Sequence, residues 1–273
     1  MEKVIIDGIE LKLSYADDFV VNWVGKEESV RQVKASWTII SDDDFPMNPR
    51  IIGKPGVGKT TLAYHVAKTF SENVYIFQCT SDTRPEDLII TPVISEEQKI
   101  SYHASAVVTA MIKGGVCILD EGNRMSEKSW ASLAPLLDSR RYVESVTAGI
   151  KIKAHKNFRI CTTMNDDAST FDVPDYIQSR LQPRIELDHP NAEEEMNILK
   201  TNLPNAEESI LKLIVKFLQD GHKNKEIFTI RDGINIARYC IKTIYLDNKI
   251  SKNKAFKLAI EQILGQNGLK YLS

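Results

Sequence analysis

A glycine-rich segment has the residue types and spacing of a phosphate-binding loop. Residues 53–60 read GKPGVGKT, which fits the pattern G-x-x-x-x-G-K-[ST] between a strand-like run and a helical pattern. Glycines let backbone N–H groups curl around an anion, and the positive end of the following helix dipole faces the same anion. We expect Lys59 to reach the β- and γ-phosphates of a nucleoside triphosphate and the Thr60 hydroxyl to ligate Mg²⁺. The predicted nucleotide contacts are Gly53, Pro55, Gly56, Val57, Gly58, Lys59, Thr60 and Thr61.

Two adjacent carboxylates follow a buried-strand pattern further along the chain. Residues 116–119 read VCIL and are followed by Asp120 and Glu121. Such an apolar run is typical of a central strand in a parallel sheet, whose polar end emerges at the carboxyl edge where ligands bind. We expect Asp120 to hold the Mg²⁺ shell and Glu121 to orient and deprotonate an attacking water. Without the phosphate-binding loop before it, the same pair would indicate only a solvated strand end.

A third strand-like run ends in an amide side chain. Residues 158–164 read FRICTTM and lead to Asn165, whose amide can polarise the same water or touch the γ-phosphate. Taken alone, an asparagine at a strand end is usually a turn former. Together with the loop and the carboxylates, Asn165 predicts a site that hydrolyses its nucleotide.

The order of the predicted elements indicates an α/β fold followed by helices. Short β-rich runs alternate with helical patterns, which predicts a P-loop NTPase domain over residues 1–188 with a parallel sheet flanked by helices. At the start of the chain, apolar runs on either side of Asp7 and Gly8 predict a β-hairpin. Beyond the segment 188–190 only helical periodicity remains, so we predict an all-α lid domain over residues 189–273.

Composition and charge exclude some classes of protein and partner. Lys and Arg number 35 against 37 for Asp and Glu, and a net charge of −2 provides no global basic field for nucleic acid or an anionic membrane. The N-terminus has no secretory apolar block, and no run of about 18 apolar residues occurs. The four cysteines form no CxxC pair, which favours buried free thiols over a zinc site. We therefore expect a cytoplasmic protein without membrane contact.

Five motifs together resemble the AAA+ ATPases, and specifically their MoxR-like branch, which carries an insertion in its second helix. The motifs are GKPGVGKT, CILDEGNRM, TTMN, YIQSRLQPRIEL and FTIRDGINIARY. The resemblance covers about residues 20–264. Residues 1–20 are an N-terminal extension for which the family offers no counterpart. The resemblance implies an AAA+ core with a C-terminal helical lid, ATP hydrolysis with Mg²⁺, and assembly into a homo-oligomer, expected to be a hexameric ring.

The resemblance also assigns roles to arginines outside the strand ends. Arg180, in the sequence QSRL, matches the arginine finger that reaches the γ-phosphate bound by a neighbouring subunit, and Arg184 is the alternative. The family's phenylalanine after the finger is Leu181 here, which leaves the choice between the two arginines open. Arg231 matches the sensor 2 arginine, which contacts nucleotide from the lid. Both Arg180 and Arg231 could instead be surface residues, with Thr229 simply capping a helix.

Two further segments match regions that project toward the pore in a ring of this family. Residues 96–103 occupy the helix-2 insert, and residues 147–156 occupy the hairpin before sensor 1. In the hairpin, Lys151 and Lys153 alternate with apolar residues and are candidate pore or client contacts. The same alternation is also expected of any hairpin with one solvated face.

Three functions are consistent with these motifs. The first is a chaperone-like remodelling ATPase that acts on a partner protein, which the resemblance suggests could carry a von Willebrand factor A domain. The second is an NTPase motor subunit of a nucleic-acid restriction or defence system, similar to McrB and preferring GTP, which the near-neutral charge disfavours. The third, a small-molecule kinase or a nucleotide-holding scaffold, does not require Glu121, Asn165 or Arg180.

Overall fold

The computed structural model describes residues 1–94, 100–166 and 172–272, and the chain divides into two units. The first unit comprises residues 1–21, 26–53 and 59–187, and the second comprises residues 22–25, 54–58 and 188–273. Each unit has its own hydrophobic core. The tip of the glycine-rich loop is thus grouped with the C-terminal helices, whereas its flanking strand and helix belong to the first unit.

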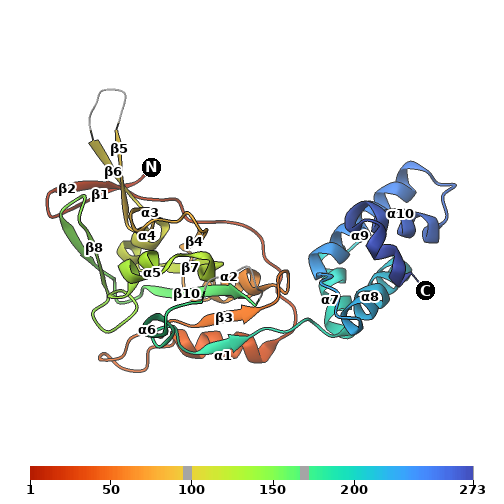
Figure 1. Cartoon of the computed structure of the whole chain (residues 1–273), viewed down its shortest axis with the longest axis horizontal. Helices are drawn as coiled ribbons and strands as arrows, with labels where there is room; N and C mark the ends of the chain where they lie inside the picture. The colour runs from red at the N-terminus through yellow and green to blue at the C-terminus, as the bar shows by residue number, and fades with distance from the viewer. Residues whose placement is uncertain (95–99, 167–171, 273) are drawn as a thin grey trace. The chain divides into compact units, whose positions relative to one another are not determined.

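A five-stranded parallel sheet forms the centre of the first unit (Figure 1). The strands are, in spatial order, β11 (Arg184–Glu186), β3 (Arg50–Gly53), β10 (Arg159–Asn165), β7 (Val116–Asp120) and β4 (Val74–Gln78). Since the strands are parallel, their carboxyl ends lie at one edge, where Gly53 is paired with Asn165 and Gln78 with Asp120. The predicted α/β fold is confirmed, and the strand order brings the three predicted site segments together.

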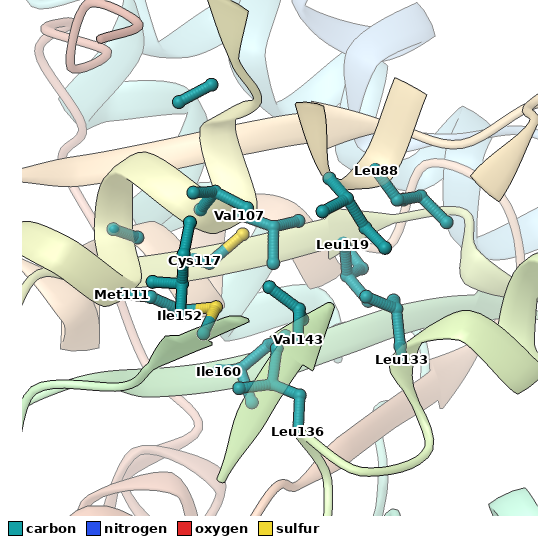
Figure 2. Close-up of a cluster of buried hydrophobic side chains, with 14 of the residues drawn as sticks. Leu88, Val107, Met111, Cys117, Leu119, Leu133, Leu136, Val143, Ile152 and Ile160 are labelled. Carbon is teal, nitrogen blue, oxygen red and sulfur yellow. The ribbon is translucent and has the colours of Figure 1, made fainter. Parts of the chain in front are cut away.

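Buried side chains cover both faces of β7, an interior strand of this sheet. Cys117 and Leu119 pack with Val107 and Met111 in one hydrophobic cluster, which Figure 2 shows. Ile118 points to the opposite face and is equally buried. The helices of this unit are α1 (Glu27–Trp37), α2 (Lys59–Ala67), α3 (Pro85–Leu88), α4 (Ala106–Lys113), α5 (Glu127–Leu133) and α6 (Asp175–Gln178). An apolar run with both faces covered explains the uninterrupted sequence VCIL.

A second, four-stranded sheet joins the N-terminus to the insert region. Its order is β1 (Lys3–Ile6), β2 (Ile9–Lys12), β6 (Ile100–Ala104) and β5 (Ile90–Ile94). The predicted N-terminal hairpin is confirmed: Asp7 and Gly8 turn the chain with positive φ angles of 48° and 83°. Strand β2 then pairs in parallel with β6. Residues 96–99 of the predicted insert lie outside the described residues.

The predicted hairpin before β10 is formed by β8 (Tyr142–Ser145) and β9 (Ile150–Lys153). Ile150 and Ile152 are buried, whereas Lys151 and Lys153 are exposed. Tyr102 Oη, from the second sheet, donates to Thr147 O at 3.4 Å. This hairpin therefore has one face on the core and one in solvent.

Four amphipathic helices form most of the second unit. They are α7 (Ala192–Asn202), α8 (Glu208–Lys223), α9 (Ile230–Leu246) and α10 (Lys252–Leu264), followed by the 3₁₀ helix η2 (Gln266–Tyr271). Phe217 packs against Phe228 and Phe256 at the centre of their core. Asn191 and Thr229 begin α7 and α9 with capping boxes. The helical character expected after residue 188 is present.

The four cysteines lie in the interior of the protein as thiols. Cys79, Cys117, Cys161 and Cys240 are all free and buried, as predicted, and burial raises the pKa of each thiol. Among the described residues, no helix has the length and apolar character needed to cross a bilayer.

Candidate functional site

The glycine-rich loop connects β3 to α2, and α2 begins at Lys59. Gly56 and Gly58 have φ angles of 76° and 98°, which residues with a Cβ rarely adopt. Lys59 is buried, and its Nζ donates to Gly53 O at 2.9 Å and to Asn165 Oδ1 at 2.8 Å. The lysine predicted to hold phosphates is thus positioned by the end of β3 and by the end of β10.

The two predicted Mg²⁺ ligands lie in direct contact. Thr60 Oγ1 donates to Asp120 Oδ1 at 2.5 Å, and Thr163 Oγ1 donates to the same oxygen at 2.6 Å. A hydroxyl and a carboxylate are hard oxygen ligands of the kind that Mg²⁺ accepts, and Mg²⁺ usually completes its shell with waters and substrate phosphates. The described residues contain no cluster of three or more His, Cys, Asp or Glu side chains that could hold a metal alone. Thr60 and Asp120 therefore fit a magnesium ion that arrives with a phosphate ligand.

Glu121 has an unusual backbone conformation, and each of its carboxylate oxygens accepts a hydrogen bond. Its φ and ψ are 55° and 43°, in the left-handed region, and its N–H donates to Thr163 Oγ1 at 2.9 Å. Oε1 accepts from Asn165 Nδ2 at 3.0 Å, and Oε2 accepts from Arg124 Nε at 2.6 Å. A left-handed non-glycine residue costs about 1–2 kcal/mol, and such strain is often found at functional sites.

Asn165 connects the phosphate-binding lysine to the carboxylate. Its amide oxygen accepts from Lys59 and its amide nitrogen donates to Glu121. Asn165 is buried at the end of β10, between β3 and β7, so its side chain can reach both neighbours. The predicted residues Lys59, Asn165 and Glu121 thus form one continuous hydrogen-bonded chain.

Four residues of this site were not predicted from the sequence. Thr163 contacts Asp120 and Glu121, Arg124 pairs with Glu121, and Gln78 Nε2 lies 3.5 Å from Glu121 Oε2. Asn123 holds the backbone of Asn165, with Nδ2 donating to Asn165 O at 2.7 Å. Gln78 could have been found, because it ends a strand-like run as Asp120 does.

The two candidate finger arginines differ in how they are held. Arg180 Nε lies 3.3 Å from Asp138 Oδ2, and its Nη1 donates to Tyr176 O at 2.5 Å. Hydrogen bonds from Arg140 above all, and also from Arg180, lower the pKa of Asp138 to about 2. Arg184 is more exposed and pairs with Glu186 at 2.8 Å. None of these contacts joins either arginine to a residue of the strand-end site in the same chain.

Arg231 lies exposed in the first turn of α9, in the second unit. The cap of this helix is made by Thr229, whose Oγ1 accepts from Asp232 N at 3.1 Å. Within the same unit, an ideal Cβ on Gly56 would lie 2.4 Å from Thr229 Cγ2, and one on Gly58 would lie 3.3 Å from Trp23. The start of α9 and Trp23 therefore pack closely on the tip of the glycine-rich loop.

Lys151 and Lys153 are exposed on β9 and are separate from the strand-end cluster. Lys151 Nζ lies 4.5 Å from the centre of the Tyr142 ring and 3.9 Å from Glu144 Oε2. These contacts are those of a solvated hairpin face, and the role of the two lysines in binding a client is a proposal from the sequence.

Comparisons with known proteins agree with this fold. Residues 50–181 match the family described as "AAA domain (dynein-related subfamily)". An uncharacterized protein of Staphylococcus saprophyticus is 22% identical over 230 residues, which cover 79% of this chain and 84% of that protein. The denitrification regulatory protein NirQ of Stutzerimonas stutzeri is 29% identical over 115 residues, which cover 42% of each chain.

Solved structures provide the same fold. The Holliday junction branch migration motor RuvB of Thermotoga maritima superposes with a TM-score of 0.62 at 16% identity, covering 90% of this chain and 72% of that one. A putative ATPase from Cytophaga hutchinsonii gives a TM-score of 0.53 at 16% identity, covering 90% and 76%. At these identities the likeness concerns the fold alone.

Proposed function

We propose that this chain, which carries an AAA domain over residues 50–181 and is similar to NirQ, is an AAA+ ATPase of the MoxR-like branch, and that it forms a ring which uses ATP hydrolysis to change the conformation or assembly of a partner protein. The partner is expected to be a protein, since a net charge of −2 offers no general attraction to nucleic acid. The comparisons do not support a von Willebrand factor A partner in particular.

The hydrolytic step follows from the residues at the strand ends. Lys59 neutralises charge on the β- and γ-phosphates, while Thr60 and Asp120 hold the Mg²⁺ that accompanies ATP. The metal's contribution is to offset charge on the phosphate oxygens. Glu121 accepts a proton from the attacking water, and the Asn165 amide orients that water. Arg180 of a neighbouring subunit adds positive charge to the γ-phosphate.

The observation that carries the proposal is the Lys59–Asn165–Glu121 chain, with contacts of 2.8 and 3.0 Å. The side-chain amide of Asn165 contacts both Lys59, which is expected to bind phosphate, and Glu121, which can activate water. A site that only stored nucleotide would not require this link. The chain therefore favours turnover over simple binding.

The decisive experiment is a Glu121→Gln variant. We expect ATP to stay bound with near wild-type affinity while hydrolysis falls by about a hundredfold or more, because the amide cannot accept the proton. Glu127→Gln, an exposed glutamate of α5, is the matched control and should hydrolyse ATP normally. Undiminished hydrolysis in Glu121→Gln would remove this residue from the mechanism.

The same variant tests the remodelling function. A ring locked with ATP should retain its partner, so a tagged Glu121→Gln protein should enrich one protein over the Glu127→Gln control, and that protein should change conformation or assembly when wild-type subunits hydrolyse ATP. Comparing turnover with ATP and GTP, with and without DNA, tests the alternative motor function. A preference for GTP, or stimulation by DNA, would contradict the proposal.

A further inference from the structure

A guanidinium lies against the carboxylate of the proposed base. Arg124 Nε donates to Glu121 Oε2 at 2.6 Å, and the two side chains are 34% and 33% exposed. On the other carboxylate oxygen, Asn165 Nδ2 donates to Oε1 at 3.0 Å. One donor on each oxygen fixes the plane in which the carboxylate lies.

The turn that presents Arg124 is tightly built onto β10. Residues Gly122–Arg124 form a 3₁₀ turn, η1, directly after Glu121. An ideal Cβ on Gly122 would lie 2.2 Å from Thr162 Oγ1, so only glycine allows the turn to come this close to the strand. Asn123 donates to Asn165 O at 2.7 Å and accepts from Asn165 N at 3.3 Å. Both contacts fix the position from which Arg124 reaches back to Glu121.

The side chains that donate hydrogen bonds to the Glu121 carboxylate leave room for a water molecule to donate as well. An ionised carboxylate has about four acceptor sites. Arg124 and Asn165 fill two of them, and Gln78 Nε2 lies at the limit of a third contact, 3.5 Å from Oε2. At least one site of Glu121 therefore stays available, and its direction is set by the donors on the others.

We propose that Arg124 is a positioning residue for ATP hydrolysis, which holds the Glu121 carboxylate so that its remaining acceptor site faces the attacking water. This inference rests on the proposed role of Glu121. The guanidinium is suited to this task because its planar fork stays charged and fixes direction as well as distance. Arg124 acts through Glu121 and not on the phosphates, so its loss should affect turnover and not nucleotide affinity.

The test compares Arg124→Met, Arg124→Lys and the control Lys128→Met, an exposed cation of α5. Methionine keeps the aliphatic stem of Arg124 and removes the donors. We expect kcat to fall by about tenfold, as for other misplacements of catalytic groups, while KM for ATP changes by less than about twofold. Arg124→Lys should regain at least about a third of the lost rate, because an ammonium can still pair with Glu121. Lys128→Met should match the wild type.

Three outcomes would overturn the inference. The first is an unchanged kcat in Arg124→Met, and the second is a raised KM with unchanged kcat, which would indicate nucleotide binding instead. The third is an equal loss in Arg124→Met and Arg124→Lys together with a lower Tm or a smaller assembly, which would indicate a packing role. If Glu121→Gln abolishes turnover while Arg124→Met is fully active, only this inference fails. Full activity of Glu121→Gln would remove the proposed function's base as well.

Discussion

The hydroxyl of Thr163 donates to the carboxylate of Asp120 at 2.6 Å and accepts from the backbone N–H of Glu121 at 2.9 Å. Its side chain is fully buried on β10, the strand next to β7. A single hydroxyl thus fixes the side chain of the predicted metal ligand and the backbone of the predicted base. Since β7 ends at Asp120, this bond also defines where Glu121 leaves the sheet.

Replacing Thr163 with valine should slow hydrolysis and weaken the use of Mg²⁺. The methyl group keeps the shape of the side chain but removes one of the two donors on Asp120 Oδ1 and leaves the N–H of Glu121 without its acceptor. An unsatisfied N–H of this kind costs about 1–3 kcal/mol. We expect kcat to fall at least tenfold and half-saturation to require more Mg²⁺, measured by titrating Mg²⁺ at saturating ATP. Thr163→Ser retains the hydroxyl and should stay within about threefold of the wild type. Equal activity of the valine and serine variants would contradict this role.

Adding a methyl group at Gly56 should weaken ATP binding. The residue has a φ angle of 76°, and an ideal Cβ would lie 2.4 Å from Thr229 Cγ2. Alanine costs about 1–2 kcal/mol in the left-handed conformation, so the free loop of the variant should relax away from it, and ATP binding must then restore it at that cost. About 1.4 kcal/mol corresponds to a tenfold change in affinity. Titration with a fluorescent ATP analogue should therefore show a Kd for Gly56→Ala at least about tenfold higher.

The matched control is Gly149→Ala. Gly149 has a similar φ angle of 67°, but no atom lies within 4 Å of an ideal Cβ there. Its Kd for the analogue should equal that of the wild type. If both variants bind alike, crowding at the loop tip does not matter for nucleotide affinity.

Local sequence patterns were sufficient to predict the glycine-rich loop and the strand ends. The loop is specified by contiguous residues, and the short β-rich runs that end at Asp120 and Asn165 are typical of strands buried on both faces. Because parallel strands end at the same edge of the sheet, the residues that follow them lie close together. The residues of the site could therefore be predicted without knowing the register between the strands.

Contacts between strands could not be predicted in the same way. Thr162 and Thr163 are equivalent in the sequence, and only the pairing of β10 with β7 decides which of them faces Asp120. The pairing of β2 with β6 joins residues about ninety positions apart, for which a single sequence holds no signal. Arg124 was missed because its importance depends on a 3₁₀ turn that Gly122 allows.

Substitution of Arg180 should remove most of the ATPase activity of the proposed oligomer. The guanidinium is oriented by Asp138 and by Tyr176 O, whereas the more exposed Arg184 pairs only with Glu186 in the contacts described above. We expect Arg180→Ala to lower kcat by about 10³-fold, as for other arginines that act in trans, and Arg184→Ala to lower it by less than about threefold. Steady-state ATPase measurements at a protein concentration that maintains assembly provide the comparison.

Mixing subunits shows whether Arg180 acts on a neighbour. Arg180→Ala subunits keep Glu121, and Glu121→Gln subunits keep Arg180, so a mixed assembly of the proposed kind contains interfaces with both groups intact. Activity of the mixture should exceed the sum of the two separate proteins. If Arg184→Ala shows the greater loss and the mixture gains nothing, Arg184 and not Arg180 is the finger.

Glu195 should make the helical second unit less stable as pH rises. Its side chain is fully buried on α7, and burial raises its pKa from about 4.5 to about 7, while His222 Nδ1 lies 3.6 Å from Oε1. Below pH 4.5 the group is protonated in both the folded and the unfolded chain. Between pH 4.5 and about 7 only the unfolded chain releases the proton, so the free energy of unfolding falls by up to about 3 kcal/mol and then levels off.

Glu195→Gln removes this ionisation while keeping the size of the side chain. Its Tm should equal that of the wild type near pH 4.5 and exceed it by several degrees at pH 8, measured by thermal unfolding across this range. Glu193→Gln, an exposed position in the same first turn, is the control and should follow the wild type at both pH values. His222 Nδ1 lies 3.6 Å from Glu195 Oε1, so Glu195→Gln should be compared and combined with His222→Gln. If the pH dependence disappears in His222→Gln but persists in Glu195→Gln, the histidine and not the glutamate causes it.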